Sequence, residues 1–458
     1  MAIKKNDLLT LDIEDITNLG FGVARHEGQV IFVSGAVPGD KIEGKVIKVA
    51  ASFAVARIDK LLSESPLRIS DRCCVTGCTS CAYKRISYAE ERLRKEEAVR
   101  QIFKKSGLDE VKISPLFPSP IEHHYRNKAQ YPIALDKNGN YVIGFYAPKS
   151  HRVTEAASCP LAPQAFSDIL ELLRDFFKKH SISVYDEESG RGLLRHVYLR
   201  RGQVSGEILL TLVINGAALP CSEELVALVR GAFPEVVGIL LNVNRESTNV
   251  ILGDKYITLW GKDYITDTLA GVKLKITAPS FYQVNHDCAE ELYAMARRLA
   301  APKEGDTVLD LYCGAGSIGL SMAHLCREVI GIEIVDSAVK CAKENAENNG
   351  IKNASFYTGD AKDTEKLLDN AERERGAKIC PDIVILDPPR GGCDSVLLRH
   401  IACTLVPGKI VYISCNPQTL ARDMVVLREL GYVGDEVTPV DMFPGTGHVE
   451  SVVCLTRK

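Results

Sequence analysis

The sequence lacks the long apolar run that a membrane-spanning helix needs. No stretch approaches the roughly 20 consecutive apolar residues that cross a bilayer. A secretory leader is missing too, because the opening "MAIKKNDLLTLDIED" turns acidic before any apolar core begins. Internal repeats and low-complexity tracts are also absent. We therefore expect a globular, cytoplasmic protein that does not bind membranes.

A strong excess of charge of either sign is missing as well. Lys and Arg number 56 and Asp and Glu 59, so the formal net charge is only -3. If nucleic acid is the partner, local basic patches and not bulk charge must bind it. The length of 458 residues is enough for about two to four domains.

Three regions of the chain differ in their pattern. Residues 1–62 alternate apolar and polar positions between glycine-containing turns, which predicts a small β-barrel. Residues 63–275 mix strand-like and helix-like segments, which is typical of an α+β domain. Residues 276–458 alternate apolar strands with helical segments, as in a doubly wound, mostly parallel sheet. We predict a multidomain α/β protein divided at these boundaries.

The fifteen cysteines favour reduced thiols, metal ligands or catalysis over a disulfide framework, because their number is odd and they are scattered. The segment "DRCCVTGCTSCAYKRI" concentrates four of them. Within it, Cys78 and Cys81 have the C-x-x-C spacing of a ligand pair. Four thiolates suit either a tetrahedral zinc ion or an iron-sulfur cluster, and the spacing alone favours zinc.

A glycine-rich turn marks the C-terminal region. In "VLDLYCGAGSIGL", Gly314, Gly316 and Gly319 follow a predicted strand, and Glu333 ends the next one. This is the layout of a dinucleotide site. S-adenosylmethionine also carries an adenosine ribose, so the turn leaves it and NAD equally open. Asp360 in "TGDAKD" follows another strand, where it could meet an adenine amine, although a solvated loop aspartate would fit as well.

Two further residues stand at predicted strand ends. Asp387 in "ILDPPRGG" precedes two prolines, which hold the backbone extended, so its carboxylate could orient a flat ring or an amine. Cys415 lies in "YISCNPQTLARD". A single cysteine is more often a small core residue than a nucleophile, but the carboxyl edge of such a sheet is where ligands bind. An enzyme using a pyridine nucleotide has no evident use for this thiol and aspartate.

These segments together resemble the RNA uracil-5-methyltransferase family, in the branch with an N-terminal TRAM domain and a [4Fe–4S] cluster. The resemblance is carried by "SFYQVN", "LDLYCGAGSIGL", "LDPPRGG", "SCNPQTLARD" and "GTGHVESVVCL", and it covers nearly the whole chain. It implies an RNA-binding TRAM barrel, a central domain with the cluster, and a Rossmann-like methyltransferase domain. It also implies S-adenosylmethionine and the iron-sulfur cluster as cofactors.

The resemblance assigns roles to individual residues, with Cys415 as the nucleophile and Glu450 as the general base. It assigns contacts with the cofactor to Gln283, Tyr312, Glu333 and Asp387. With the residues of the glycine-rich turn and the aspartate of "TGDAKD" added, the predicted cofactor contacts are Gln283, Tyr312, Gly314, Gly316, Glu333, Asp360 and Asp387. The cluster ligands are Cys73, Cys78, Cys81 and Cys159. Cys74 competes with Cys73, because the interval to Cys78 is shortened. We expect a structural role for the cluster, because the methyl transfer is not a redox reaction.

The chemistry explains why these groups are needed. Uracil C5 is a poor nucleophile until a thiolate adds to C6, and a base must later remove the C5 proton. The target base must also leave the RNA stack, and Phe281 or Tyr282 could then provide a stacking surface.

Two stretches, "HHYRNKAQY" and "RGLLRHVYLRR", combine local positive charge with aromatic residues. The predicted RNA contacts are Arg126, Lys128, Arg195, Tyr198, Arg200 and Phe281. A solvated strand face would show the same pattern.

We expect a monomer that methylates 23S ribosomal RNA, with tRNA as the alternative substrate. An NAD-linked iron-sulfur oxidoreductase would explain the glycine turn and the cysteines but not "DPPR", "SCNP" or "HVE". The presence of both Cys415 and Glu450 argues against a catalytically silent RNA-binding protein.

Overall fold

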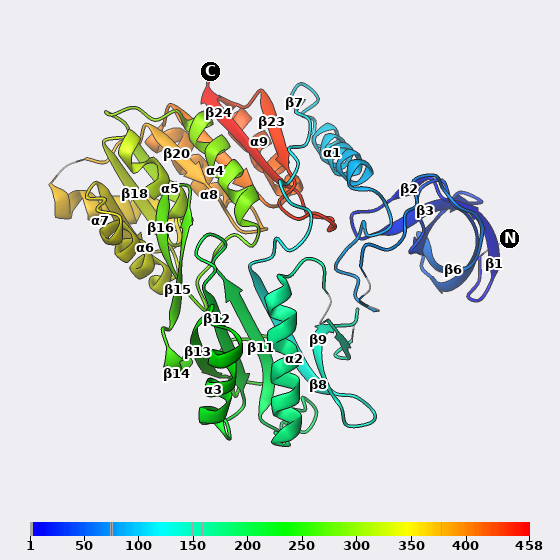
Figure 1. Cartoon of the computed structure of the whole chain (residues 1–458). Helices are drawn as coiled ribbons and strands as arrows, with labels where there is room; N and C mark the ends of the chain where they lie inside the picture. Colours follow the sequence, from blue (N-terminus) through cyan, green and yellow to red (C-terminus); the bar gives the residue numbers. More distant parts are fainter. Residues whose placement is uncertain (1–2, 74, 76, 149, 157–158, 377) are drawn as a thin grey trace.

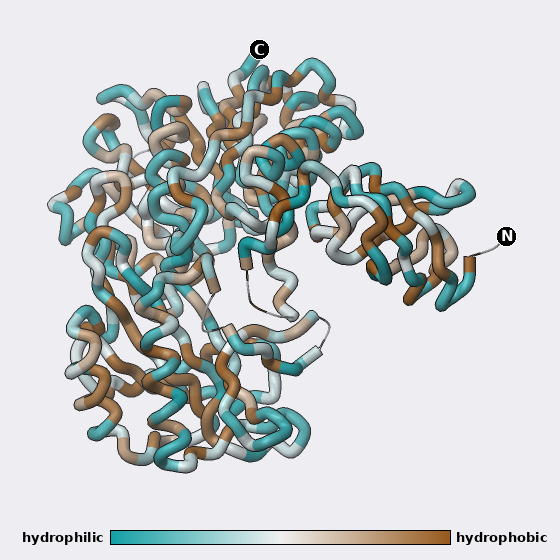
Figure 2. Tube along the Cα trace, turned by 45° about the vertical axis from the view of Figure 1, so that its right-hand side comes forward, coloured by the Kyte–Doolittle hydropathy of each residue, from teal (hydrophilic) through white to brown (hydrophobic). Residues whose placement is uncertain are grey.

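The computed structural model describes residues 3–73, 75, 77–148, 150–156, 159–376 and 378–458. Three parts are visible in Figure 1: a small barrel near the N-terminus, a sheet with helices from the middle of the chain, and a larger α/β part that carries the C-terminus. Figure 2 shows hydrophobic stretches mainly inside each part and hydrophilic stretches mainly at its periphery. Among the described residues, no helix is both long and apolar enough to cross a membrane.

The N-terminal barrel is a six-stranded sheet in the order β1-β5-β6-β4-β3-β2. Its strands are β1 (Leu8–Asp12), β2 (Asp15–Ile16), β3 (Phe21–His26), β4 (Gln29–Ser34), β5 (Lys41–Val49) and β6 (Phe53–Ser63). Buried and less buried residues alternate along β3 and β5, as the two-residue period of a strand requires. The inward side chains, among them Ile31, Val33 and Ile42, form a core of their own. This confirms the small β-barrel predicted for the start of the chain.

The central part is a seven-stranded mixed sheet in the order β10-β9-β8-β11-β12-β13-β14. The strands are β8 (Lys128–Leu135), β9 (Tyr141–Tyr146), β10 (Val153–Glu155), β11 (Leu194–Arg201), β12 (Ile208–Ile214), β13 (Val236–Val243) and β14 (Lys255–Gly261). Helices α2 (Gln164–Lys179) and α3 (Ser222–Ala232) pack on this sheet. Helix α2 buries Phe166, Ile169 and Leu173 against the strands, and their spacing places them on one helix face.

The C-terminal part is built on a sheet in the order β19-β18-β17-β20-β21-β24-β23-β7. Its strands are β7 (Lys112–Ile113), β17 (Thr307–Leu311), β18 (Glu328–Glu333), β19 (Ala354–Thr358), β20 (Ile383–Leu386), β21 (Lys409–Ser414), β23 (Glu436–Val440) and β24 (Glu450–Arg457), with β22 (Tyr432–Val433) paired to β24. The strands from β19 to β21 run parallel, and β24 is antiparallel to β21.

Helices cover both faces of this sheet. One core contains residues of α4 (His286–Ala300), α5 (Ser317–Met322) and α6 (Asp336–Asn348). The other contains residues of α1 (Tyr88–Lys105), α7 (Thr364–Arg375), α8 (Ser395–His400) and α9 (Pro417–Glu429). Strand β17 contributes Val308 to the first core and Leu309 to the second, because successive side chains point to opposite faces. The predicted doubly wound sheet is confirmed.

Besides α1, a strand and a hairpin from around the region 63–275 pack with the C-terminal part. Strand β7 extends that sheet by pairing in parallel with β23. The hairpin of β15 (Tyr264–Leu269) and β16 (Val272–Thr277) packs Ile265 and Leu274 into the same core as α4. Residues before and after position 275 therefore pack into the same core, and the predicted domain boundary at residue 275 stays a prediction.

Candidate active site

Five parallel strands end at one edge of the C-terminal sheet, and a polar residue stands at each of these ends. In the order of the strands these residues are Asp360 after β19, Glu333 ending β18, Tyr312 after β17, Asp387 after β20 and Cys415 after β21. Glu450 opens the antiparallel strand β24 and so lies at the same edge. The structure thus brings residues that are far apart in the sequence to the edge where such sheets bind ligands.

The glycine-rich turn begins with strained backbone. Tyr312 has a φ of 66°, which is uncommon for a residue with a side chain. Gly316 has a φ of 81°, and a Cβ there would lie 3.0 Å from the Phe356 ring and 3.2 Å from Ala342. This turn therefore packs its backbone against β19 and α6 in a way that a larger residue would disturb. Burial and the neighbouring Cys393 raise the pKa of the Tyr312 hydroxyl.

Two carboxylates hold this turn. Glu333 accepts hydrogen bonds from the backbone N–H of Gly314 at 3.1 Å and of Val335 at 2.8 Å. Asp310, inside β17, accepts from the N–H of Gly319 at 2.9 Å, and its other oxygen has no hydrogen-bond partner among the described residues. Burial raises the pKa of Asp310 to about 7. The sequence reasoning missed Asp310, because an acidic residue within an apolar strand carries no motif of its own.

Gln283 joins the edge from the segment before α4. Its side chain is buried. Burial and then the charge of Asp387 raise the pKa of Tyr293, and a hydrogen bond between Gln283 and the Tyr293 hydroxyl opposes this shift. The Tyr293 hydroxyl also lies 3.0 Å from the Ser317 hydroxyl, at the start of α5. Tyr293 thus links Gln283, the glycine-rich turn and Asp387. From the sequence pattern, Tyr293 could be recognised only as an apolar position of a helix.

Asp360 is more solvated than Asp387 and Glu450 at this edge. It accepts from the N–H of Lys362 at 3.0 Å and forms an ion pair with the ammonium of the same residue at 3.0 Å. The hydrogen bonds from Lys362 lower the pKa of Asp360. Its carboxylate is therefore charged at neutral pH.

Cys415 and Glu450 are neighbours across two strands. The ladder between β21 and β24 ends with the pair Ser414 and Ser451, so the next position outward sets Cys415 opposite Glu450. Helix α9 starts immediately after Cys415, with Asn416 as its N-cap accepting from the N–H of Gln418. Glu450 is buried and Cys415 half-buried. A thiol and a carboxyl group are thereby held on rigid elements.

Burial and the neighbouring carboxyl groups disfavour ionisation of both groups. Burial, then Glu450 and Asp387, raise the pKa of Cys415 to about 11, and the positive charge of Arg390 opposes this shift. Burial and then Asp387 raise the pKa of Glu450 to about 8, and Arg390 again opposes the shift. Burial raises the pKa of Asp387 itself to about 7. Arg390 therefore supplies the positive charge that favours the thiolate and the carboxylate.

A cavity of about 230 Å³ opens beside Cys415. Its lining includes Arg390, Asn416 and His448 from the C-terminal part, together with residues of α1 and Asn18 of the barrel. Three distant segments of the chain thus line the cavity beside the thiol. The sequence reasoning did not foresee the contributions of α1 and the barrel, because neither carries a reactive side chain at this place.

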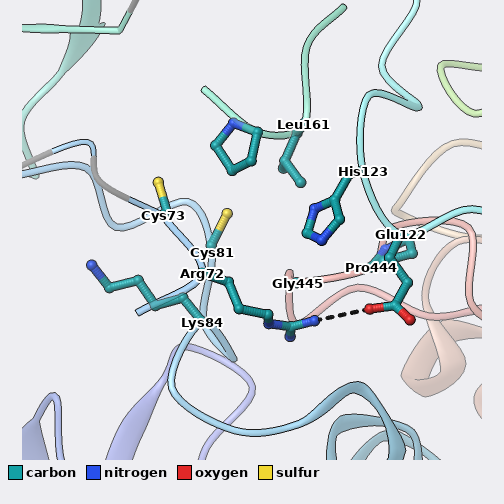
Figure 3. A pocket seen from close by; sticks show the side chains of 10 residues that line it. Arg72, Cys73, Cys81, Lys84, Glu122, His123, Leu161, Pro444 and Gly445 are labelled. Atoms are coloured by element: carbon teal, nitrogen blue, oxygen red, sulfur yellow. Dashed lines mark hydrogen bonds and ion pairs between the residues drawn. The ribbon is translucent and has the colours of Figure 1, made fainter. Parts of the chain in front are cut away.

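The predicted cluster ligands also come together. Burial raises the pKa of Cys81 to about 12, and the next contributions come from Cys73, Cys159 and Cys78, so the four thiols are neighbours. Figure 3 shows the sulfur atoms of Cys73 and Cys81 side by side, near Arg72 and its ion pair with Glu122. The alternative ligand Cys74 lies outside the described residues. Among the residues that the structure describes, no group of three or more His, Cys, Asp or Glu side chains is arranged to hold a metal ion.

Comparisons with known proteins agree with this geometry. A family model described as tRNA (Uracil-5-)-methyltransferase matches residues 87–458, and a TRAM domain model matches residues 4–58. The chain belongs to the uracil-5-methyltransferase family. It is an RNA (uracil-5-)-methyltransferase with an N-terminal TRAM domain.

Similar proteins match almost the whole of this methyltransferase. A protein of Bacillus cereus (strain ATCC 10987 / NRS 248), named as an uncharacterized RNA methyltransferase, is 40% identical over 99% of this chain and 98% of its own. A protein of Clostridium tetani with the same name is 38% identical over 100% and 98%. The crystal structure of Pyrococcus abyssi tRNA (uracil-54, C5)-methyltransferase, in complex with S-adenosyl-L-homocysteine, is 28% identical and has a TM-score of 0.77, covering 98% of this chain and 100% of that one.

The predicted RNA contacts divide into buried and accessible residues. Arg195 is buried and donates to the carbonyl oxygens of Asn244 and Glu246, both at 2.9 Å. Arg200 and Tyr198 are buried as well, and Arg200 donates to the Tyr198 hydroxyl at 2.8 Å. These three side chains support neighbouring backbone, and their burial counts against direct contact with RNA.

The remaining predicted contacts are more accessible. Phe281 is 65% exposed in the segment before Gln283. Arg126 and Lys128 are partly buried, and burial together with the charges of Arg200 and Arg126 lowers the pKa of Lys128 to about 8. Positive charge is thus concentrated at the start of β8.

Proposed function

We propose that this methyltransferase acts on uridine C5 in large-subunit ribosomal RNA through a covalent bond between Cys415 and uracil C6. The observation that carries the mechanism is the position of Cys415 opposite Glu450 at the carboxyl edge of the sheet, with Asp387 beside them. The choice of ribosomal RNA rests on the resemblance to the TRAM-containing branch with a cysteine cluster.

The residues divide the chemistry between them. Cys415, as thiolate, adds to C6 and breaks the conjugation of the ring, which makes C5 nucleophilic. After C5 has gained the methyl group, Glu450 takes the C5 proton. The electron pair of that C–H bond reforms the ring double bond, and the C6–S bond breaks to release Cys415. Once ionised, a carboxylate whose pKa is raised to about 8 is a stronger base than an ordinary carboxylate.

S-adenosylmethionine would supply the methyl group, and the edge of the sheet suits its parts. We assign Glu333 and Tyr312 to the adenosine, Asp360 to the adenine amine, and Gln283 and Asp387 to the remainder of the cofactor; the position of Glu333, Tyr312, Asp360 and Asp387 at the carboxyl ends of neighbouring strands supports this assignment. The unpartnered oxygen of buried Asp310 supports a polar ligand beside the glycine-rich turn.

For the four thiols we prefer an iron-sulfur cluster to zinc. Four thiolates suit either group, and the choice of the cluster rests on the resemblance to the branch of the family that carries one. Cys73, Cys78, Cys81 and Cys159 would hold it, in a structural role next to the segment of Pro444 and Gly445.

A tRNA substrate is the second candidate. It is favoured by the similarity to the archaeal tRNA (uracil-54, C5)-methyltransferase over nearly the whole of both chains. The chemistry at Cys415 would be the same for either RNA.

Nucleoside mass spectrometry separates the two candidates. Unmodified ribosomal RNA and unmodified tRNA are each incubated with the protein and S-adenosylmethionine, with Cys415→Ala in parallel. We expect 5-methyluridine in ribosomal RNA only, and only with Cys415 intact. Its formation in tRNA alone would replace our substrate with the second candidate, and formation by Cys415→Ala would overturn the covalent mechanism.

A further inference from the structure

The turn between β2 and β3 of the barrel lies against the catalytic segment. The Asn18 carbonyl approaches Gly447 so closely that a Cβ on Gly447 would lie only 1.7 Å from it. Gly447 stands three positions before Glu450 in "GTGHVE". In Figure 1 the β2 side of the barrel faces the loop that leads into β24. The absence of a side chain at Gly447 is therefore what allows the barrel to reach the active site.

The same turn is fixed from its other side. A Cβ on Gly20 would lie 2.5 Å from the carbonyl oxygen of Ala82, next to the cluster ligand Cys81. The N–H of Tyr83 donates to the carbonyl of Gly445 at 3.0 Å, which ties the cysteine segment to the catalytic segment. The turn is thus clamped between these two segments.

Internal hydrogen bonds make the turn rigid. The hydroxyl of Thr17 accepts from the N–H of Leu19 at 3.3 Å and from that of Phe21 at 3.1 Å. The N–H of Gly20 donates to the carbonyl of Thr17 at 2.9 Å. A turn held in this way presents Asn18 in a fixed position.

The side chain of Asn18 is available to a ligand. Asn18 is exposed and lines the cavity that contains Cys415, and no hydrogen bond of its amide to another described residue is found. Leu19 beside it is 70% exposed. An amide carries both donors and an acceptor, as recognition of a base edge requires. In unpaired RNA those edges are accessible.

We propose that Asn18 is a specificity-determining residue, whose amide hydrogen-bonds the base of the nucleotide next to the target uridine. The target base itself enters the cavity toward Cys415, while Asn18 stands on the wall that the barrel contributes. The barrel would then select the RNA sequence at the active site in addition to binding RNA elsewhere. This proposal rests on the RNA methyltransferase activity and holds for ribosomal RNA or tRNA.

The test measures sequence preference around the target. Transcripts of the RNA that the wild-type protein methylates are made with each of the four bases at the two positions flanking the modified uridine. Initial methylation rates are measured for the wild type, Asn18→Ala and Asn18→Asp. The control is Asn138→Ala, which removes an exposed asparagine from the β8–β9 turn.

We expect the wild type to prefer one base at one flanking position by roughly tenfold, the size of a good base contact. Both Asn18 variants should lose most of this preference through a slower reaction on the preferred RNA, while Asn138→Ala keeps it. Equal slowing on all transcripts would assign Asn18 a merely structural role and overturn the proposal. The proposal would also be overturned if the Asn18 variants kept the base preference, or if the wild type showed no base preference. Failure of the wild type to methylate either RNA class would instead contradict the activity itself.

Discussion

Cys415 and Glu450 occupy opposing positions one step beyond the last paired residues of β21 and β24. Because a ladder fixes the register of both strands, the distance between thiol and carboxyl group depends on the sheet and not on a flexible loop. Glu450 also pairs with Val440 of β23, which holds it from the other side. The two proposed catalytic groups are therefore positioned by three adjacent strands.

Replacing Cys415 with Ala should abolish methylation and leave binding of S-adenosylmethionine nearly unchanged. The thiol stands at the end of the row of proposed cofactor residues, so its loss removes the nucleophile alone. Methylation and calorimetric binding of the methyl donor are measured on the same preparation. Cys403→Ala, which removes an exposed cysteine of the same domain, should behave as the wild type does. Methylation by Cys415→Ala would contradict the assignment.

Glu450→Gln should trap the protein on its RNA. Addition of Cys415 to C6 does not need the base, whereas release does, so a covalent complex should accumulate and turnover should fall by roughly 100-fold or more. Denaturing electrophoresis with labelled RNA detects the complex. The matched control is Glu429→Gln, at an exposed position of α9. Normal turnover without a trapped species would exclude Glu450 as the base.

Arg390→Met should move the pH–rate profile to higher pH. The positive charge of Arg390 lowers the pKa of both Cys415 and Glu450, so its removal raises both values. Since the reaction needs the thiolate and the carboxylate, the rate at neutral pH should fall and recover as the pH rises. Arg399→Met, at an exposed site on α8, is the control. If the variant showed a lower rate at every pH without a shift of the pH–rate profile, Arg390 would instead be assigned a contact with the substrate.

The sequence predicted the fold and the row of strand-end residues well, because both follow from local patterns. Apolar strands followed by glycine, Asp-Pro or Cys-Asn predict a parallel sheet with ligands at its edge, and Glu333, Asp387 and Cys415 lie there. The predictions from charge were weaker. Arg195 and Arg200 sit in a stretch that looks like a basic surface, yet both are buried. Their hydrogen bonds to the carbonyl oxygens of Asn244 and Ser280 are tertiary contacts that local sequence does not encode.

The roles of Asn18 and Asp310 lay beyond sequence reasoning for the same reason. Asn18 lines the same cavity as Cys415 only because the barrel docks there, and Asp310 is unusual only because its strand is fully buried.

Asp310→Asn should make stability less sensitive to pH. Burial raises the pKa of Asp310 to about 7, far above that of an unfolded aspartate. The folded protein therefore binds the proton of Asp310 more tightly than the unfolded chain does. This tighter binding stabilises the fold at low pH, and the stabilisation is lost as the pH rises from about 4 through about 7. Asparagine cannot ionise and can still accept from Gly319. Thermal unfolding should show a Tm difference between pH 5 and pH 8 that is smaller in the variant by roughly 2 °C or more. An equal difference in both proteins would contradict this account.

Protein purified without oxygen should contain iron and acid-labile sulfide in equal amounts, about four of each. Changing Cys78 and Cys81 to Ser should remove both, because these residues supply half of the proposed ligands. Cys221→Ser, at an exposed cysteine, should retain them. Stoichiometric zinc in place of iron would overturn the cluster and leave the methyltransferase chemistry intact.

The pairing of β7 with β23 has a consequence for the order in which the protein is made. Ser114, directly after β7, hydrogen-bonds Glu436, which is 322 residues farther along the chain. During synthesis the barrel and α1 leave the ribosome well before β23, the strand that pairs with β7. Contacts of such long sequence separation form slowly. The edge of the catalytic sheet is therefore completed late, and until then β7 remains an unpaired strand that a chaperone or a second nascent chain could reach.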